Sequence, residues 1–344
     1  MLSFLLVFAT LFHACEPAEN EVPSPSWQRQ SLDRAASIRG LSVVDEQVAW
    51  LSGSLNTIAR TTDGGQSWQL LPAPASDSLD FRDIEAFDSL RAVVMSAGPG
   101  LQSQVYRTED GGQSWELKLL NPDTAGFFNG IAFWDAQHGL LTGDPVDGKL
   151  LIMTTGDGGR SWQRIPPAAI PPVDSMEYGF AASGSHISTA ADSLAWIGTG
   201  GRSARVFRST DGGRSWSVTA TPMISGDPST GIFSIAFLNN QQGIAVGGDY
   251  TRPTLVNDNI MSSSDGGRSW RLIEGHQVAY RSCVREVDGW FLTCGPGGSD
   301  ISYDLGRSWQ RIDTTAYHVI AVGKEREAVW AAGPEGKVAK IKWD

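Results

Sequence analysis

Residues 61–68 read Thr61-Thr62-Asp63-Gly64-Gly65-Gln66-Ser67-Trp68, and the pattern Ser/Thr-x-Asp-x-Gly-x-Ser-Trp occurs six times in the 344-residue chain. The other copies begin at Thr108, Thr155, Ser209, Ser263 and Ser302. Successive motif aspartates lie 47, 47, 54, 54 and 39 residues apart. This period suits four short strands with their turns, which is one blade of a β-propeller.

The residue types of the motif indicate a structural turn. Asp accepts backbone N–H bonds in a tight turn, Gly supplies positive φ, and the Ser or Thr hydroxyls satisfy further turn groups. The tryptophan buries a large ring between neighbouring layers. Six aspartates at one structural position cannot all be catalytic, and no copy has the ligand pattern of an EF-hand. We therefore predict a structural role for Asp63, Trp68, Asp110, Trp115, Asp157, Trp162, Asp211, Trp216, Asp265, Trp270, Asp304 and Trp309.

The motif resembles the Asp-box (BNR) repeat of sialidases, sortilins and photosystem II stability/assembly factor-like proteins. Each box is expected to join the third strand of a blade to the fourth. Complete blades are predicted over 35–72, 80–120, 126–166, 177–220, 231–274 and 278–312, and residues 316–343 supply three strands without a box. Ser26-Trp27-Gln28-Arg29 matches Ser308-Trp309-Gln310-Arg311, the start of a fourth strand. We predict an all-β, seven-bladed propeller of four-stranded antiparallel blades, closed by the N-terminal strand completing the last blade.

The N-terminus is typical of an exported protein. Residues 2–14 are almost wholly apolar but too few to span a bilayer, which predicts a signal peptide over residues 1–14. Ala14-Cys15 resembles a bacterial lipobox, although Phe12 and the lack of a preceding Lys or Arg depart from that pattern. The expected product is a cell-envelope lipoprotein, periplasmic or surface-facing, anchored by lipid on Cys15 alone, with a linker at 15–25 and the propeller at 26–344. The alternative is ordinary cleavage with loss of Cys15.

Charge and composition narrow the partners. A formal charge of −11 disfavours nucleic-acid binding, which needs clustered Lys and Arg. A monomer is expected, since an acidic balance favours solubility.

Cys283 and Cys294 flank the hairpin turn Asp288-Gly289 and are predicted to face each other across two antiparallel strands. Directly opposed positions lie within disulfide range, although theirs is a hydrogen-bonded pair, which suits a bridge less well. A disulfide and two free thiols both remain open.

In a four-stranded blade, the loops between second and third strands share one face with the inter-blade segments, and the Asp-boxes lie on the other. Blades 1 and 2 have short, plain loops there, so any site is expected off-centre. The candidate binding cluster, for a sugar, a peptide or an anionic group, comprises Asp144, Arg205, Asp249, Tyr250, Tyr280, Arg281, Asp300 and His318. The alternative is that these residues only satisfy one another.

No catalytic, cofactor or metal site emerges from the sequence. Arg164-Ile165-Pro166 resembles a sialidase arginine motif, but it follows the third box instead of preceding the first. Asp144, Asp249 and Asp300 are the candidates for the two carboxylates of a glycoside hydrolase. The four histidines after residue 15 stand far apart, without metal-ligand spacing.

Resemblance to the photosystem II stability/assembly factor-like group implies an exported propeller that binds protein. We predict a non-catalytic lipoprotein that acts as a binding or assembly scaffold for a protein or glycan partner through its loop-rich face. A glycoside hydrolase or sialidase-like enzyme is the alternative.

Overall fold

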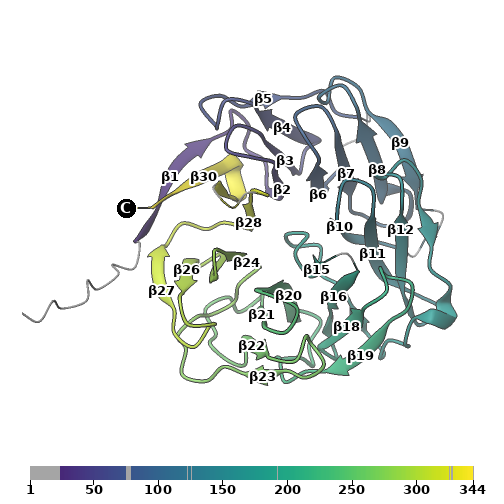
Figure 1. Ribbon diagram of the computed structural model, residues 1–344, viewed down its shortest axis with the longest axis vertical. Coiled ribbons are helices and arrows are strands. Elements are labelled where there is room, and N and C mark those ends of the chain that lie inside the picture. Colours follow the sequence, from purple (N-terminus) through teal and green to yellow (C-terminus); the bar gives the residue numbers. More distant parts are fainter. Residues whose placement is uncertain are drawn as a thin grey trace, which may run out of the picture.

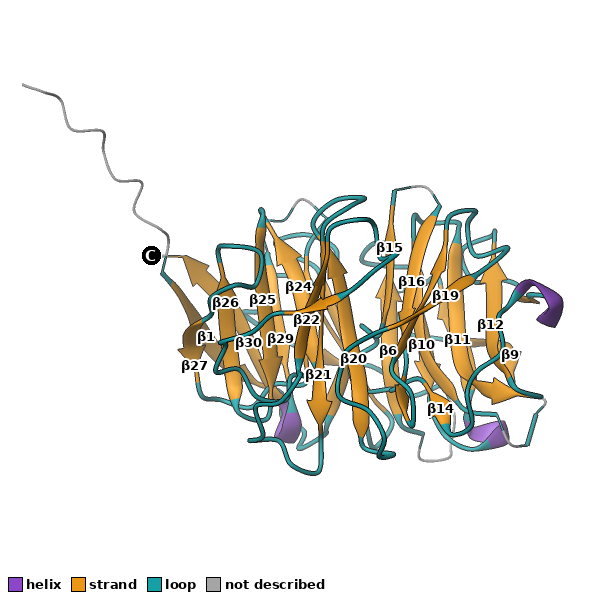
Figure 2. Ribbon diagram, turned by 90° about the horizontal axis from the view of Figure 1, so that it is seen from below, coloured by secondary structure: helices purple, strands orange, loops and turns teal. Residues whose placement is uncertain are grey.

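The computed structural model describes residues 24–74, 79–121, 123–124, 126–191, 193–324, 326 and 328–343. The predicted signal peptide, Cys15 and the linker up to residue 23 lie outside this part of the chain. Seven antiparallel sheets stand around a central axis (Figure 1), and the side view shows a flat disc with the strands running between its two faces (Figure 2). The predicted seven-bladed propeller is confirmed.

The blades follow one another along the chain. Blade 1 consists of β2 (Ile38–Val43), β3 (Ala49–Gly53), β4 (Thr57–Thr61) and β5 (Gln69–Leu70). Blade 2 consists of β6 (Phe81–Ala86), β7 (Ala92–Ser96), β8 (Gln104–Thr108) and β9 (Glu116–Leu120). Blade 3 consists of β10 (Phe128–Phe133), β11 (Gly139–Val146), β12 (Lys149–Thr155) and β13 (Gln163–Arg164). Blade 4 consists of β15 (Ile187–Ala190), β16 (Leu194–Gly198), β18 (Arg205–Ser209) and β19 (Ser217–Ala220). Blade 5 contains β20 (Thr230–Phe237), β21 (Gly243–Asp249), β22 (Ile260–Ser263) and β23 (Arg271–Leu272). Blade 6 consists of β24 (Cys283–Val287), β25 (Trp290–Gly295), β26 (Gly298–Ser302) and β27 (Gln310–Asp313). Three short 3₁₀ turns are η1 (Gly100–Gln102), η2 (Pro167–Ala169) and η3 (Pro334–Gly336).

The N-terminal strand closes the ring as predicted. Blade 7 combines β28 (Val319–Val322), β29 (Val329–Ala332) and β30 (Lys337–Trp343) with β1 (Pro25–Ser31). β1 pairs antiparallel with β30 over its whole length, from Pro25 opposite Trp343 to Ser31 opposite Lys337. Trp27 is buried, and its Nε1 donates a hydrogen bond of 2.7 Å to Ser299 Oγ in blade 6. Closure therefore joins two blades as well as completing one.

Each Asp-box connects the third and fourth strands of blades 1 to 6, and all six use the same hydrogen bonds. In the first, Gly65 N–H donates to Thr61 Oγ1 at 2.9 Å. Ser67 N–H donates to Asp63 Oδ1 at 3.0 Å, and Ser67 Oγ donates to Asp63 Oδ2. These bonds from Ser67 lower the pKa of Asp63 to about 2. Gly64 and Gly65 adopt φ of 71° and 85°, where a side chain would be strained.

The core lies between neighbouring blades. Trp50, Trp196 and Trp330 are at most 1% exposed and come from the second strands of their blades. Trp196 Nε1 donates to the carbonyl of Gly266, in the Asp-box of the next blade, at 2.9 Å. The box is thus also a docking surface for the preceding blade.

One departure from the predicted blades lies between blades 4 and 5. The two-residue strands β14 (Glu177–Tyr178) and β17 (Gly200–Gly201) join the sheet of blade 5, which becomes six-stranded. The chain then runs through 179–186 before β15 begins. Within the described ranges, no helix is long and apolar enough to cross a membrane.

Candidate functional site

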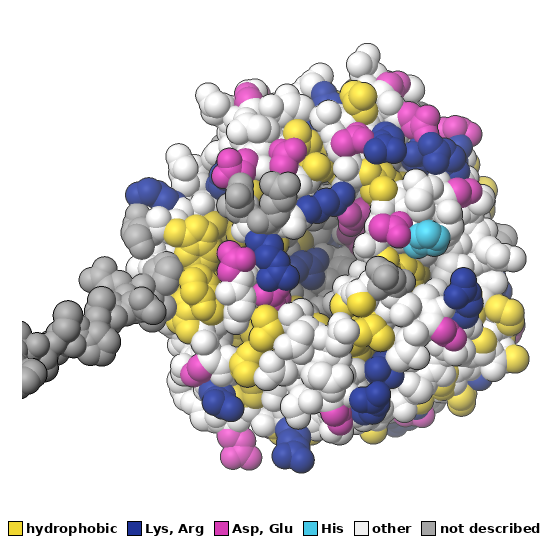
Figure 3. Space-filling view, viewed as in Figure 1, with side chains coloured by type: hydrophobic (Ala, Val, Ile, Leu, Met, Phe, Trp, Pro, Cys, Tyr) yellow, Lys and Arg dark blue, Asp and Glu magenta, His cyan; other side chains and the backbone are white. Residues whose placement is uncertain are grey.

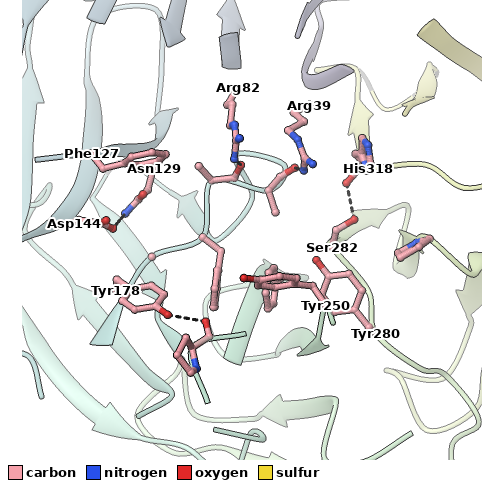
Figure 4. A pocket seen from close by; sticks show the side chains of 17 residues that line it. Arg39, Arg82, Phe127, Asn129, Asp144, Tyr178, Tyr250, Tyr280, Ser282 and His318 are labelled. Carbon is pink, nitrogen blue, oxygen red and sulfur yellow. Dashed lines mark hydrogen bonds between the residues drawn. The ribbon is translucent and has the colours of Figure 1, made fainter. Parts of the chain in front are cut away.

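A pocket of about 460 Å³ opens at the axis of the ring on the face that carries the inter-blade segments and the loops between second and third strands. We call this face the loop-rich face and the opposite one the Asp-box face. The close-up in Figure 4 shows side chains from several blades converging on the pocket. Its lining comprises Arg39, Arg82, Phe127, Asn129, Asp144, Tyr178, Gly179, Phe180, Ala181, Ala182, Pro228, Phe233, Tyr250, Tyr280, Ser282, Pro296 and His318.

The floor of this pocket is residues 179–186, the plug segment, which contacts several blades around the axis. Ser183 Oγ donates to the carbonyl of Ser282 in blade 6 at 2.7 Å. The carbonyls of Ala182 and Ala181 accept hydrogen bonds from Arg39 and Arg82, at 3.1 and 3.2 Å. The plug segment therefore separates the pocket from the rest of the channel.

Two arginines supply the positive charge of the pocket. Arg82 forms an ion pair with Asp80 (2.8 Å), whereas Arg39 has no ion pair with any residue that the structure describes. Burial lowers the pKa of Arg39, and the charge of Arg82 lowers it further. Burial and the same two arginines lower the pKa of His318 to about 3, so its imidazole is neutral at physiological pH. An anionic group entering here would meet an uncompensated guanidinium.

Aromatic rings form the opposite wall. Phe180 of the plug segment stacks on Phe233 at 3.9 Å between ring centroids, and Tyr280 stands perpendicular to Phe233 at 4.8 Å. Tyr250 lies at the rim and is 50% exposed. This wall suits apolar or planar groups next to a charged one.

One carboxylate faces the pocket. Asp144 accepts a hydrogen bond of 2.9 Å from Asn129 Nδ2, and burial raises the pKa of Asp144. Among the described residues Asp144 has no arginine partner, whereas Asp249 and Asp300 each form an ion pair with an arginine.

The eight residues of the predicted cluster divide into two groups. Asp144, Tyr250, Tyr280 and His318 line the pocket. The other four are held in ion pairs outside its lining. Asp300 lies between Arg281 (2.9 Å from Nε) and Arg311 (2.6 Å), and both Arg281 and Asp300 are buried.

Asp249 and Arg205 are engaged in the same way. Asp249 accepts from Arg252 Nε at 2.7 Å, and Arg205 Nε lies 3.0 Å from the buried carboxylate of Glu177. Of the three aspartates considered for a glycoside hydrolase, only Asp144 lines the pocket, so no two of them face a substrate there.

The sequence predicted a site away from blades 1 and 2. This prediction is wrong, because Arg39 and Arg82, which line the pocket, come from these blades. Both follow the residue that opens an innermost strand, Ile38 or Phe81. Asn129 has the same place in blade 3, and His318 directly precedes the innermost strand of blade 7. Arg39, Arg82 and Asn129 thus share one position of the repeat, whereas His318, already part of the predicted cluster, lies just before it.

Cys283 and Cys294 stand opposite each other in the hairpin of blade 6, in the predicted register. Both are completely buried free thiols, and Cys283 Sγ accepts a long hydrogen bond of 3.3 Å from Ile320 N–H. In the part of the chain that the structure describes, no three His, Cys, Asp or Glu side chains are grouped to hold a metal ion.

Comparison with known proteins finds one matching family model and several structures of similar fold. The family model described as photosynthesis system II assembly factor YCF48 matches residues 19–123. Among curated proteins none matches the sequence significantly.

Two similar solved structures carry the same name. The structure described as YCF48 bound to D1 peptide is 18% identical, covers 95% of this chain and 99% of its own, and has a TM-score of 0.68. YCF48 from Cyanidioschyzon merolae is 16% identical, with coverages of 92% and 98% and a TM-score of 0.63.

An enzyme shares the fold. The GH74 xyloglucanase from Xanthomonas campestris is 14% identical, covers 92% of this chain but 55% of its own, and has a TM-score of 0.60. Similarity at this level establishes the architecture alone. The six Asp-boxes, the family model over residues 19–123 and the two YCF48 structures show that the chain is similar to YCF48 in its motif and in its propeller fold.

Proposed function

We propose that the chain is a non-catalytic, exported propeller that binds a segment of a protein partner in the pocket on its loop-rich face. One observation carries the proposal: the Arg39 guanidinium has no ion pair among the described residues and faces a pocket walled by aromatic rings. The fold of this chain is also that of the structure described as YCF48 bound to D1 peptide, and this likeness supports a peptide as ligand.

The shape of the pocket favours a chain segment over a folded surface. The plug segment closes its inner end, so a ligand enters from the loop-rich face only. A volume of about 460 Å³ accommodates a few side chains. The ligand we expect carries a carboxylate, for Arg39 and Arg82, next to an apolar or aromatic group, for Phe233 and Tyr250.

Location forms part of the proposal. We infer an envelope lipoprotein anchored through Cys15, so that the propeller lies close to partners at the same membrane. An anchored scaffold would meet membrane-bound partners at high effective concentration.

Photo-cross-linking in living cells tests this function. A photoreactive phenylalanine analogue replaces Tyr250 at the rim of the pocket or, as the control, Leu90, which is 53% exposed in the turn between β6 and β7 on the Asp-box face. We expect the first position alone to capture a distinct protein, identified by mass spectrometry. Equal capture from both positions, or capture of glycan alone, would refute the proposal.

A second variant separates charge recognition from general contact. Arg39→Gln should lower the cross-linking yield about tenfold, the usual effect of losing a charge-assisted hydrogen bond. Arg202→Gln removes an exposed arginine that lies outside the pocket lining and should leave the yield unchanged. An unchanged yield with Arg39→Gln would contradict the role of the guanidinium.

A further inference from the structure

A second cavity, of about 280 Å³, lies on the other side of the plug segment and opens towards the Asp-box face. Figure 3 shows this face hollowed at the centre of the ring, with Lys or Arg and Asp or Glu side chains gathered around the hollow. Its walls come from β6, β10, β15, β20 and β24, and none of its lining residues belongs to the first pocket.

The plug segment is fixed firmly enough to keep the two cavities apart. Ser234 Oγ donates to Ser185 Oγ at 2.7 Å, and Ile235 N–H donates to the carbonyl of Ser185 at 2.9 Å. Gly184 adopts φ of 67°, and a Cβ there would lie 2.4 Å from the carboxylate oxygens of Asp83. Only glycine allows this close approach.

Three side chains in the second cavity retain unused hydrogen-bonding capacity. Among the described residues, the carboxylate of Glu85 and the hydroxyl of Ser188 form no hydrogen bond or ion pair, and both line the cavity. The Arg285 guanidinium makes one long hydrogen bond, of 3.4 Å, to the carbonyl of Val284. They come from blades 2, 4 and 6 and so approach the axis from three sides.

The other charged groups nearby are already engaged. Asp83 accepts hydrogen bonds from Ile84 N–H (2.9 Å) and Ile131 N–H (2.8 Å). Glu286 is paired with Arg326 at 2.7 Å, and Lys324 is exposed and donates to the carbonyl of Phe87 at 3.5 Å. The unused negative group is therefore Glu85 and the unused positive group within the cavity is Arg285.

Burial raises the pKa of both Asp83 and Glu85 to about 7, so the cavity holds carboxylates that lack sufficient positive compensation. An ammonium group would supply that compensation, whereas Arg285 calls for an anion. Glu85 and Arg285 both line the cavity without forming an ion pair with each other, and its volume of about 280 Å³ accommodates a small molecule that carries both charges.

We propose that this cavity binds a small zwitterion of the amino-acid class. Its ammonium group lies against Glu85, its carboxylate against Arg285, and the Ser188 hydroxyl donates or accepts a further hydrogen bond. The site is independent of partner binding on the loop-rich face.

Calorimetric titration of the full chain tests the proposal. The ligands are glycine, β-alanine, 4-aminobutyrate and 6-aminohexanoate, which differ only in the separation of their two charges, together with butylamine and butyrate, which carry one charge each. We expect one zwitterion to bind best and both single-charge compounds to bind about tenfold more weakly or worse.

Variants locate the binding. Glu85→Gln and Arg285→Gln should each weaken binding about tenfold, whereas the matched charge losses Glu116→Gln and Arg202→Gln, at exposed positions, should not change it. Ser188→Phe keeps both charges but places a large ring in the cavity, so it should weaken binding strongly even if a charge variant misfolds. Circular dichroism checks the fold of each variant.

Three results would overturn the proposal. One is a lack of binding by all four zwitterions. Another is butylamine binding as tightly as the best zwitterion, which would indicate a simple cation site. The third is full binding by folded Glu85→Gln or Ser188→Phe protein.

Discussion

His186 is a buried, neutral imidazole whose burial has a measurable consequence. It is 0% exposed, its Nε2 lies 2.9 Å from Thr142 Oγ1, and its Nδ1 has no hydrogen-bond partner among the described residues. Burial lowers the pKa of His186 from 6.5 to about 4. Between these values the unfolded imidazole is protonated and the folded one is not, so the unfolded state binds more protons.

The contribution of His186 to the free energy of unfolding should therefore fall by about 3 kcal/mol as pH drops from 6.5 towards 4. Asp83 and Glu85, whose folded pKa is raised to about 7, act in the opposite direction over the same range, so the effect is read as a difference between two proteins. Urea unfolding at pH 8, 6 and 5 compares wild type with His186→Gln, and the stability of the wild type relative to the variant should decrease towards pH 5. A difference that does not change with pH would contradict this assignment.

The Asp-box turn is the element that repeats, and its energy can be tested in one copy. In blade 3, Asp157 accepts from Ser161 N–H (2.9 Å) and Ser161 Oγ (2.6 Å). Thr155 Oγ1 also donates to Asp157, at 2.8 Å.

Asp157→Ala leaves these donors without their acceptor, so we expect a loss of about 1–3 kcal/mol in the free energy of unfolding. Gln163→Ala, at an exposed position on the following strand, is the control and should change stability by less than about 0.5 kcal/mol. Chemical denaturation compares the two. Equal effects would mean that the box has no special structural role.

The closing strand β1 provides a second test on an element. Trp27 contacts Tyr317 at 5.6 Å between ring centroids and also donates to Ser299. Trp27→Ala removes both interactions and should cost about 3–5 kcal/mol. Trp27→Phe keeps the ring but not the donor and should cost about 1 kcal/mol. A Trp27→Ala protein as stable as Trp27→Phe would show that β1 contributes little to closure.

Blade bounds, strand order and closure were predictable because a motif at a fixed offset specifies them. The plug segment was not, because it belongs to no repeat. The spacing of 54 residues between Asp157 and Asp211 does not reveal it, because the next spacing, from Asp211 to Asp265, is the same. In the sequence, Arg39 and Arg82 stand in stretches that resemble ordinary buried strands. The loops that carry Asp249, Arg281 and Asp300 share a face with the pocket, but ion pairs hold these side chains outside its lining, and the sequence does not show such pairing.

The whole molecule presents two cavities on opposite faces, and under the proposed lipid anchor its orientation would determine which one a membrane partner meets. Cys15→Ser should move the protein from the membrane fraction to the soluble fraction of lysed cells, because serine lacks the thiol to which the lipid would be attached. Immunoblotting of both fractions measures this, with a known lipoprotein as control. Membrane association unchanged by Cys15→Ser would contradict anchoring at this residue.

The pairing of β1 with β30 also constrains how the chain folds. β1 is the first of these strands to be synthesised, and its partner is the last, so β1 remains without its sheet until β30 has been synthesised. Contacts between residues this far apart in sequence form slowly, and the waiting strand is an edge on which another chain can add. The feature that makes the finished ring stable therefore makes the unfinished one vulnerable to aggregation, and we expect yield to depend on chaperones that shield strand edges.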